Sequence, residues 1–381
     1  MSSLTRREYL VATGLSLAAA CGRKHGAGFP GYAVIATSGD NSVSVVDLAL
    51  FRLMKQVNVG SSPRAVLTGG PDETCFVLTP KTGSVHTLDS GFDRVNSRRL
   101  AEQVSDFRLS HDGKSLLAIS APQRELLAAD CRTLQIQQRW KLPAAPVFLD
   151  VSVDGSVAIS SGPAGTVHFV NSVTGQQSTC HLSGTLGEIR FRADGKLLLV
   201  ANRTEHSIIL LSVPTLQVIV DLPLGMEPEN LCFDSYGGEL FVSGKGMDGV
   251  AIVFPYDTLQ VDQTVLAGHS PGRMVCSEQP PYLFVASSGG SDVCILSVDN
   301  RKMVGIVEVG QQPGFMAVTP DSQFALILNE ASGDMAVIHV SSIAGKLSNA
   351  AIMRSKMAAS LFTMFPVGSD PVHAAIVNRK I

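Results

Sequence analysis

The 381-residue sequence is poor in aromatic and charged residues, and these shortages exclude several classes of protein. It holds 1 Trp and 5 Tyr, which leaves few flat side chains on which bases or sugars could stack. Only 17% of the residues are charged and the formal net charge is −3, so the sequence offers no basic surface for a nucleic acid. We therefore expect no nucleic-acid partner.

The familiar catalytic motifs are also missing. The sequence has no nucleophile elbow, phosphate-binding loop, HExxH helix or CxxC pair, and its 9 His are isolated, with no two at ligand spacing. Six of the 7 Cys are scattered at spacings that match neither a metal site nor a disulfide framework. These are Cys75, Cys131, Cys180, Cys232, Cys276 and Cys294. We interpret them as small buried residues, and predict no catalytic residue, metal or cofactor.

What the sequence does have is a repeat of about 42 residues. A short apolar run recurs at 32–36 (YAVIA), 75–79 (CFVLT), 116–120 (LLAIS), 157–161 (VAISS), 198–202 (LLVAN), 240–244 (LFVSG), 283–287 (LFVAS) and 325–329 (ALILN). Each run is too short for a helix and rich in β-branched or aromatic residues, so each is predicted to be a strand. A period of this length with several strands per unit is typical of β-propeller blades.

The copy at 187–224 shows the whole unit most clearly. Strands are predicted at 187–192, 197–202, 207–213 and 217–224, and a tight turn at 193–196 (ADGK) separates the first two. A Gly-x-x-Pro link then leads to the next copy, where Pro is suited to a position that donates no ladder hydrogen bond. The links are Gly60/Pro63, Gly225/Pro228, Gly268/Pro271, Gly310/Pro313 and Gly368/Pro371.

The spacing of these links gives the number of blades. Seven periods separate Gly60 from Gly368, with about 16 residues inserted in the last one, which predicts eight blades. The first blade lacks its own innermost strand, and 371–377 (PVHAAIV) supplies one from the other end of the chain. We predict an all-β fold: a single propeller of eight four-stranded blades, closed by the C-terminal strand, with one short helix within the insertion, at 344–359.

The same residues resemble the YVTN-type β-propeller repeat family, named for a second strand like 198–202 (LLVAN). The resemblance covers about Gly31 to Val377 and implies a propeller fold. Members of that family most often have seven blades, so seven is the alternative to the predicted eight.

The N-terminus is predicted to be a targeting segment. Arg6 and Arg7 in 5–10 (TRREYL) resemble a twin-arginine export signal, and 10–20 is apolar but too short to span a membrane. Residues 17–21 (LAAAC) resemble a bacterial lipobox, in which Cys21 would be lipidated; the alternative is cleavage of a secreted protein after Ala20. We expect a signal peptide at 1–20, a lipid-anchored tether at 21–30 and the propeller at 31–381. The protein would then lie on the periplasmic side of a bacterial membrane, held there by the lipid alone.

A candidate ligand site follows from the repeat, because propellers bind ligands where the innermost strands begin, at one end of the axial channel. The polar residues at those positions are Arg64, Asp106, Glu188, Glu229, Asn230, Arg273 and His373. Several charges facing one narrow axis would be satisfied by a ligand, an ion or a column of water.

The function favoured by the sequence is a non-catalytic, monomeric binding or scaffolding module of the cell envelope, whose partner is an unknown envelope protein or a small ligand. Two alternatives stay open. One is a hydrolase such as a propeller-type lactonase, and the other is a carrier of a haem or quinone cofactor. Neither is supported by a motif, and the fold alone does not decide among them.

Overall fold

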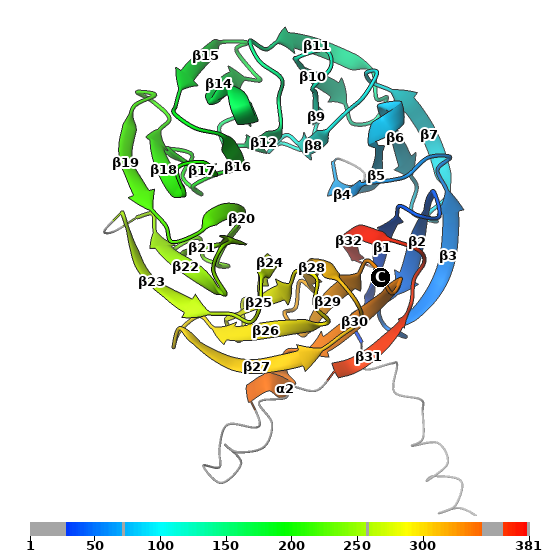
Figure 1. Ribbon diagram of the computed structural model, residues 1–381. Helices are drawn as coiled ribbons and strands as arrows, with labels where there is room; N and C mark the ends of the chain where they lie inside the picture. The colour runs from blue at the N-terminus through cyan, green and yellow to red at the C-terminus, as the bar shows by residue number, and fades with distance from the viewer. Residues whose placement is uncertain (1–27, 71–72, 257–258, 345–360, 379–381) are drawn as a thin grey trace, which may run out of the picture.

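The computed structural model describes residues 28–70, 73–256, 259–344 and 361–378. In these residues the strands form eight four-stranded antiparallel sheets, arranged as blades around a central axis (Figure 1). The eight-bladed propeller predicted from the repeat is confirmed. The predicted export signal with Arg6 and Arg7 and the lipidation site Cys21 lie outside the described residues.

The blades are numbered in chain order, and each is given from its innermost strand outward. Blade 1 contains β32 (Pro371–Asn378), β1 (Gly31–Thr37), β2 (Ser42–Asp47) and β3 (Arg52–Asn58); blade 2 contains β4 (Ala65–Gly69), β5 (Thr74–Thr79), β6 (Ser84–Leu88) and β7 (Arg94–Arg99). Blade 3 contains β8 (Asp106–Leu109), β9 (Ser115–Ser120), β10 (Glu125–Asp130) and β11 (Ile136–Lys141); blade 4 contains β12 (Phe148–Val151), β13 (Ser156–Ser160), β14 (Thr166–Asn171) and β15 (Gln177–His181).

Blade 5 contains β16 (Leu186–Phe191), β17 (Leu197–Asn202), β18 (Ser207–Ser212) and β19 (Val218–Pro223); blade 6 contains β20 (Glu227–Phe233), β21 (Leu240–Lys245), β22 (Gly249–Phe254) and β23 (Gln260–Leu266). Blade 7 contains β24 (Pro271–Cys276), β25 (Tyr282–Ser287), β26 (Asp292–Ser297) and β27 (Lys302–Glu308); blade 8 contains β28 (Pro313–Val318), β29 (Phe324–Asn329), β30 (Asp334–His339) and β31 (Leu361–Pro366). The 3₁₀ turns η1 (Pro80–Thr82) and η2 (Gly162–Ala164) and the helix α2 (Ser341–Ala344) complete the described elements.

The ring closes as predicted, by a strand from the C-terminus. β32 pairs with β1 along its whole length, from Gly31 opposite Asn378 to Thr37 opposite Pro371. The loop before β32 is held as well, since the Ser369 N–H donates to Asp40 Oδ2 at 2.7 Å. Closure gives blade 1 its fourth strand, and no blade is left without a neighbour on one side.

The second strands are apolar at most of their positions because both of their faces are buried. In β9, Leu116 and Ala118 pack toward blade 2, while Leu117 and Ile119 pack toward blade 4. Successive side chains of a strand point to opposite faces, so a strand between two blades needs apolar residues at every position. This explains why the repeat is visible as continuous apolar runs.

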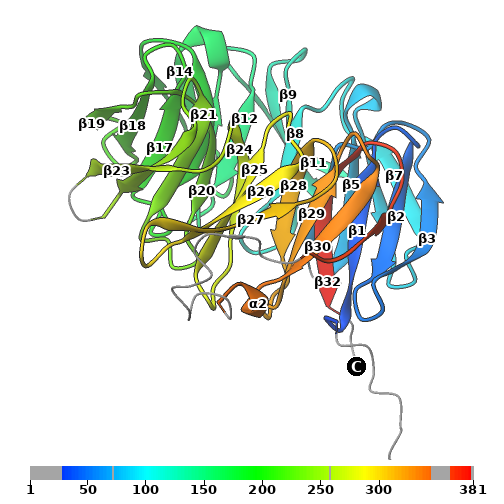
Figure 2. The same ribbon diagram turned by 60° about the horizontal axis from the view of Figure 1, so that its bottom comes forward.

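In the sequence, the insertion of the last repeat falls within blade 8. It falls between β30 and β31, and α2 begins this connection. Figure 2 shows α2 at the face of the ring where β32 ends and β1 begins. The insertion therefore adds no blade, and the count of eight stands. The helix predicted at 344–359 falls almost wholly outside the described residues. Among the described helices, none has the length and apolar character that crossing a membrane requires.

Candidate functional site: the axial channel

Each innermost strand has one residue at an equivalent position, defined by the residue of the second strand that lies opposite it. It lies opposite Leu78 in blade 2, Ile119 in blade 3 and Ala36 in blade 1. In blades 5 to 8 it lies in or beside a bulge of the innermost strand. We call this set the channel ring: Ala65, Asp106, Phe148, Glu188, Asn230, Arg273, Phe315 and His373.

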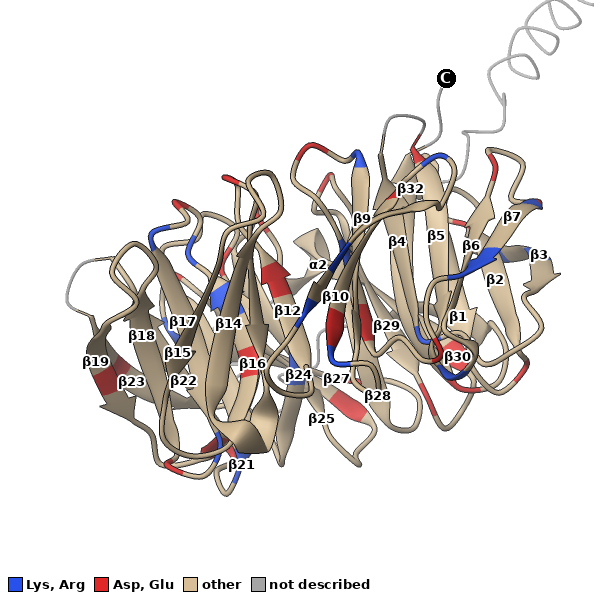
Figure 3. Cartoon of the chain, turned by 90° about the horizontal axis from the view of Figure 1, so that it is seen from above, with Lys and Arg blue, Asp and Glu red and all other residues tan. Residues whose placement is uncertain are grey.

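The predicted site residues fall on or beside the channel ring. Asp106, Glu188, Asn230, Arg273 and His373 are members of it. The other two lie one residue before it: Arg64 precedes Ala65, and Glu229 precedes Asn230. Figure 3 shows acidic and basic positions on strands around the axis as well as on the loops of both faces.

Blades 3 to 5 carry a network of carboxylates and arginines. Arg108 Nη1 lies 2.6 Å from Asp106 Oδ1, and Arg190 Nη2 lies 2.5 Å from Glu188 Oε1. Arg190 also reaches Asp150 of blade 4, with Nη1 at 3.9 Å from Oδ1. Three acids and two arginines thus share one wall of the channel. Their partial burial makes the charge pairs stronger than pairs on an open surface.

Two of these carboxylates also join neighbouring blades. The Phe191 N–H of blade 5 donates to Asp150 Oδ2 at 2.7 Å, and the Leu231 N–H of blade 6 donates to Glu188 Oε2 at 3.0 Å. Each carboxylate therefore satisfies a backbone donor of the next innermost strand. Such a donor would be left without a partner if the carboxylate were removed.

Burial changes the pKa of two acids at this wall. It raises the pKa of Asp106 and of Asp150, while the Arg108 guanidinium beside Asp106 and the Arg190 guanidinium beside Asp150 act against it. Arg190 of blade 5 also influences Asp106 of blade 3, so side chains from separate blades converge on the axis.

His373 of blade 1 is held neutral on the opposite wall. Burial, followed by the charges of Arg273 and Arg108, lowers its pKa to about 3. Its Nδ1 accepts a hydrogen bond from the Val66 N–H of blade 2 at 3.4 Å, so the proton of the neutral ring is assigned to Nε2. The Phe315 ring of blade 8 lies beside it, with ring centroids 4.1 Å apart and planes tilted by 34°.

Glu229 and Asn230 belong to a separate group at the start of β20. Arg203 Nη2 lies 2.6 Å from Glu227 Oε1 and 3.0 Å from Glu229 Oε1, and Lys245 Nζ lies 2.7 Å from the same Glu229 oxygen. The Asn230 amide donates to Ser243 Oγ at 3.3 Å within its own blade. The charges of this group are therefore matched among themselves.

Arg64 and Arg273 differ from the other channel cations. Both side chains are exposed, and within the described residues neither guanidinium forms a hydrogen bond or an ion pair. Both interact electrostatically with Glu330 of blade 8: burial and then Asp370 raise the pKa of this carboxyl, and the two arginines act to lower it. Arg273 also helps to lower the pKa of His373, whose ring lies beside that of Phe315.

Sequence reasoning missed several residues of this channel, namely Arg108, Asp150, Arg190, Glu227 and Phe315. A signal for three of them was present, because Arg108, Asp150 and Arg190 lie two residues after a channel-ring position. Residues two apart in a strand share a face. Within the described part of the chain, no group of three or more His, Cys, Asp or Glu residues is placed to hold a metal ion.

Three solved structures share this fold at low sequence identity. Dihydro-haem d1 dehydrogenase NirN in complex with DHE has a TM-score of 0.76 and 13% identity, covering 92% of this chain and 75% of that one. Apo AztD from Citrobacter koseri has a TM-score of 0.66 and 12% identity, covering 92% and 99%. Hydrazine synthase from Kuenenia stuttgartiensis has a TM-score of 0.52 and 17% identity, covering 84% and 98%. No family model and no curated protein matches the sequence. The YVTN-type repeat therefore stays a resemblance, and the comparisons establish the propeller fold alone.

Proposed function

We propose that the protein is a non-catalytic binding module that takes a small anionic ligand at one mouth of its axial channel. The ligand would carry carboxylate groups and a flat ring. Its carboxylates would pair with Arg64 and Arg273, and its ring would lie near Phe315 and His373. The observation that carries this proposal is a pair of exposed guanidiniums with no ion-pair partner among the described residues, in a channel whose other arginines pair with carboxylates.

The chemistry of the two arginines fits a carboxylate. A guanidinium presents several N–H donors in a planar fork that matches the two oxygens of a carboxylate. Arg64 and Arg273 come from blades 2 and 7, so they approach the site from two sides of blades 8 and 1. Because His373 is neutral near pH 7, it adds no charge, and its Nε2–H is a further donor.

A binding role is favoured over catalysis by the way the acids are used. A general acid or base needs an oxygen that is free to exchange a proton with the substrate. Asp150 accepts a backbone N–H of the next blade, and Glu188 accepts another while pairing with Arg190. Two of the acids that a hydrolase such as a lactonase could use are thus already engaged in holding blades together.

The cellular setting of this proposal rests on the N-terminal residues. A twin-arginine signal with Arg6 and Arg7 and a lipid on Cys21 would place a monomeric binding module at the cell envelope. An envelope protein that delivers or receives the ligand would then be its partner.

A tetrapyrrole is a ligand to test, because the NirN structure contains a bound DHE and because the channel mouth offers arginines for carboxylates. The residues fit such a ligand only in part. A metal-ligating histidine donates one ring N–H and binds the metal through the other nitrogen. His373 instead accepts at Nδ1 and carries its proton on Nε2. His373 therefore does not fit as a haem ligand, and a haem carrier is not the function proposed.

Titration calorimetry with phthalate, a benzene dicarboxylate, tests the proposal. We expect wild-type protein to bind phthalate and Arg273→Ala and Arg64→Ala to weaken binding at least about tenfold each, because each removes a charge-assisted hydrogen bond. Arg52→Ala is the matched control, since Arg52 is an exposed arginine on the outermost strand of blade 1. Benzyltrimethylammonium, of opposite charge, should not bind. Equal affinity of wild type and Arg273→Ala, or no binding by wild type, would contradict the proposal.

A further inference from the structure

The structure brings together two cysteines that the sequence spacing separates. Cys232 lies in β20 and Cys276 in β24, the innermost strands of neighbouring blades 6 and 7. Both side chains border the apolar cluster between these blades, and the Cys232 thiol helps to raise the pKa of the Cys276 thiol. All six cysteines in the described residues are free: Cys75, Cys131 and Cys294 are buried, whereas Cys180, like Cys232 and Cys276, is half-buried.

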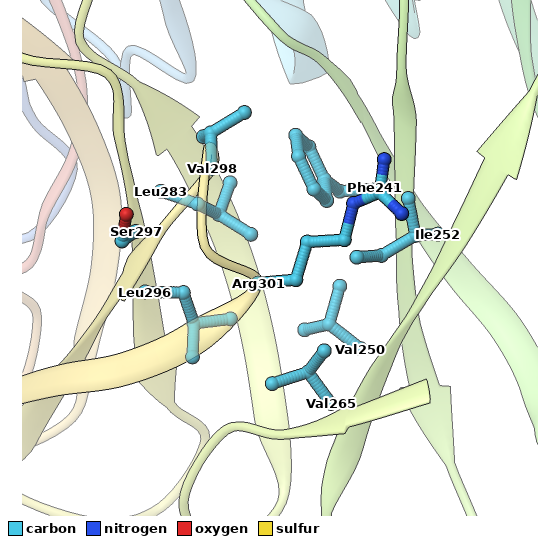
Figure 4. A pocket seen from close by; sticks show the side chains of 9 residues that line it. All are labelled: Phe241, Val250, Ile252, Val265, Leu283, Leu296, Ser297, Val298 and Arg301. Carbon is cyan, nitrogen blue, oxygen red and sulfur yellow. The ribbon is translucent and has the colours of Figure 1, made fainter. Parts of the chain in front are cut away.

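The seam between blades 6 and 7 also contains a small cavity and a pocket. Figure 4 shows a small cavity inside it, where Phe241, Ile252 and Leu283 face the stem of Arg301. A second pocket of about 230 Å³ lies beside the first and shares Arg301 with it. This pocket is lined by residues that flank the cysteines, including Asp234 and Ser277.

The second pocket contains an unsatisfied polar atom, which indicates imperfect packing at this seam. Glu239 pairs with Arg301 through Oε1 at 2.8 Å, but its Oε2 is buried without a hydrogen-bond partner. Buried oxygens in well-packed regions have partners. The seam therefore has space for small shifts of the side chains that line the second pocket.

We propose that Cys232 and Cys276 are a modification site, at which they form a reversible disulfide that links the innermost strands of blades 6 and 7. The oxidant is a small disulfide such as oxidised glutathione. The Cys232 thiolate attacks one sulfur of that disulfide, the S–S bond breaks and one glutathione thiol leaves. The Cys276 thiolate then attacks the Cys232 sulfur, the mixed disulfide breaks and the second glutathione thiol leaves. Two protein thiols are oxidised, one external disulfide is reduced, and the released thiols carry the two protons.

The surroundings of the two sulfurs indicate this order of attack. The hydrogen bond with Cys232, followed by burial, raises the pKa of the Cys276 thiol, which makes it a poor first nucleophile. Cys232 is therefore assigned as the thiol that meets the oxidant.

The bond would stabilise the ring by restricting the unfolded chain. It would enclose a loop of about 44 residues, and closing a loop of that size lowers the entropy of the unfolded state. We expect the oxidised protein to melt about 5 °C higher than the reduced protein. Reduction would return the seam to its open form.

Peptide mapping of the purified full-length protein tests the proposal. Reduced protein is incubated with oxidised glutathione under native conditions, the remaining thiols are alkylated in denaturant, and the digest is analysed by mass spectrometry. We expect a peptide pair joined through Cys232 and Cys276 that disappears after treatment with dithiothreitol. Cys232→Ala and Cys276→Ala should each lack it, whereas Cys180→Ala, which changes a half-buried cysteine of blade 4, should retain it.

The mapping of wild-type protein decides the question even where a variant folds poorly. Glutathione retained on Cys232 with Cys276 still free would overturn the proposal, because the second attack would not occur. Two free thiols after oxidation would overturn it as well. A cross-linked wild type whose melting temperature equals that of the reduced protein would contradict the stabilising role.

Discussion

The two walls of the axial channel use charge differently although they are built from the same repeat. On the wall of blades 3 to 5, Glu188 and Asp150 pair with arginine and accept backbone N–H groups of the next blade. On the wall of blades 7, 8, 1 and 2, Arg273 and Arg64 are exposed and have no ion-pair partner in the described residues. Glu188 and Arg273 occupy the same register, so position in the repeat does not decide the role of a residue.

The difference shows what a charged residue at a propeller axis can do. A carboxylate that replaces a missing backbone partner contributes to stability, and its removal leaves a buried donor unsatisfied. A solvated guanidinium contributes little to folding but retains its donors for a ligand. His373 combines features of both walls, because its Nδ1 joins blades 1 and 2 while its ring lies beside Arg273.

The largest effect is expected from deleting the closing strand, which is part of the second wall. Removing residues 372–381 would delete most of β32, leaving the edge of β1 unpaired and exposing the apolar clusters that contain Val372 and Ala374. We expect the melting temperature to fall by at least about 15 °C, or the chain to fail to fold. Deleting 379–381 alone is the control, because β32 ends at Asn378. Equal melting of the two truncated proteins would mean that the ring does not depend on this strand.

A smaller effect is expected from alanine substitutions at equivalent positions on the two walls. Glu188→Ala should lower the free energy of unfolding by about 3 kcal/mol, because the Leu231 N–H and Arg190 lose their partner in a partly buried site. Arg273→Ala should change it by less than about 0.5 kcal/mol, as expected for an exposed side chain without ion pairs. Urea unfolding at pH 7.5 measures both. Similar losses in the two variants would remove the distinction between the walls.

Much of the fold could be predicted from the sequence because blade packing leaves a regular pattern. The strands predicted at 187–192, 197–202 and 207–213 are found as β16, β17 and β18 within one residue at each end. The closing strand at 371–377 is found as β32. These predictions succeed since a second strand buried on both faces must be apolar throughout, and since Gly and Pro mark each link.

The roles of the channel residues could not be predicted in the same way. Glu188, Arg273 and His373 all occupy one register, yet only their neighbours across the seams decide whether a backbone donor, an arginine or solvent meets them. The Cys232 and Cys276 pair shows the same limit. Their spacing matches no disulfide framework, and they border one cluster because neighbouring blades bring β20 and β24 together. Contacts between repeats depend on three-dimensional packing that a one-dimensional period does not contain.

The smallest expected effect concerns His373, and its sign follows from the direction of its pKa shift. The folded-state pKa is lowered from 6.5 to about 3, so between these values the unfolded chain binds a proton that the folded protein does not. The stabilising contribution of the neutral ring is fully present above about pH 6.5 and is lost as the pH falls toward 3. The raised pKa values of Asp106 and Asp150 act in the opposite sense, because protonating these buried carboxyls favours the folded state.

A variant that cannot titrate separates His373 from these other groups. Between pH 7.5 and pH 5.0, wild type should lose about 2 kcal/mol more unfolding free energy than His373→Asn, measured by urea unfolding at both values. Asp106, Asp150 and the buried His86 are present in both proteins, so their contributions cancel in this difference. The asparagine retains a side-chain oxygen that can accept the Val66 N–H, so the link between blades 1 and 2 is not lost with the imidazole. The same pH sensitivity in both proteins would show that His373 is not the neutral, buried group of the second wall.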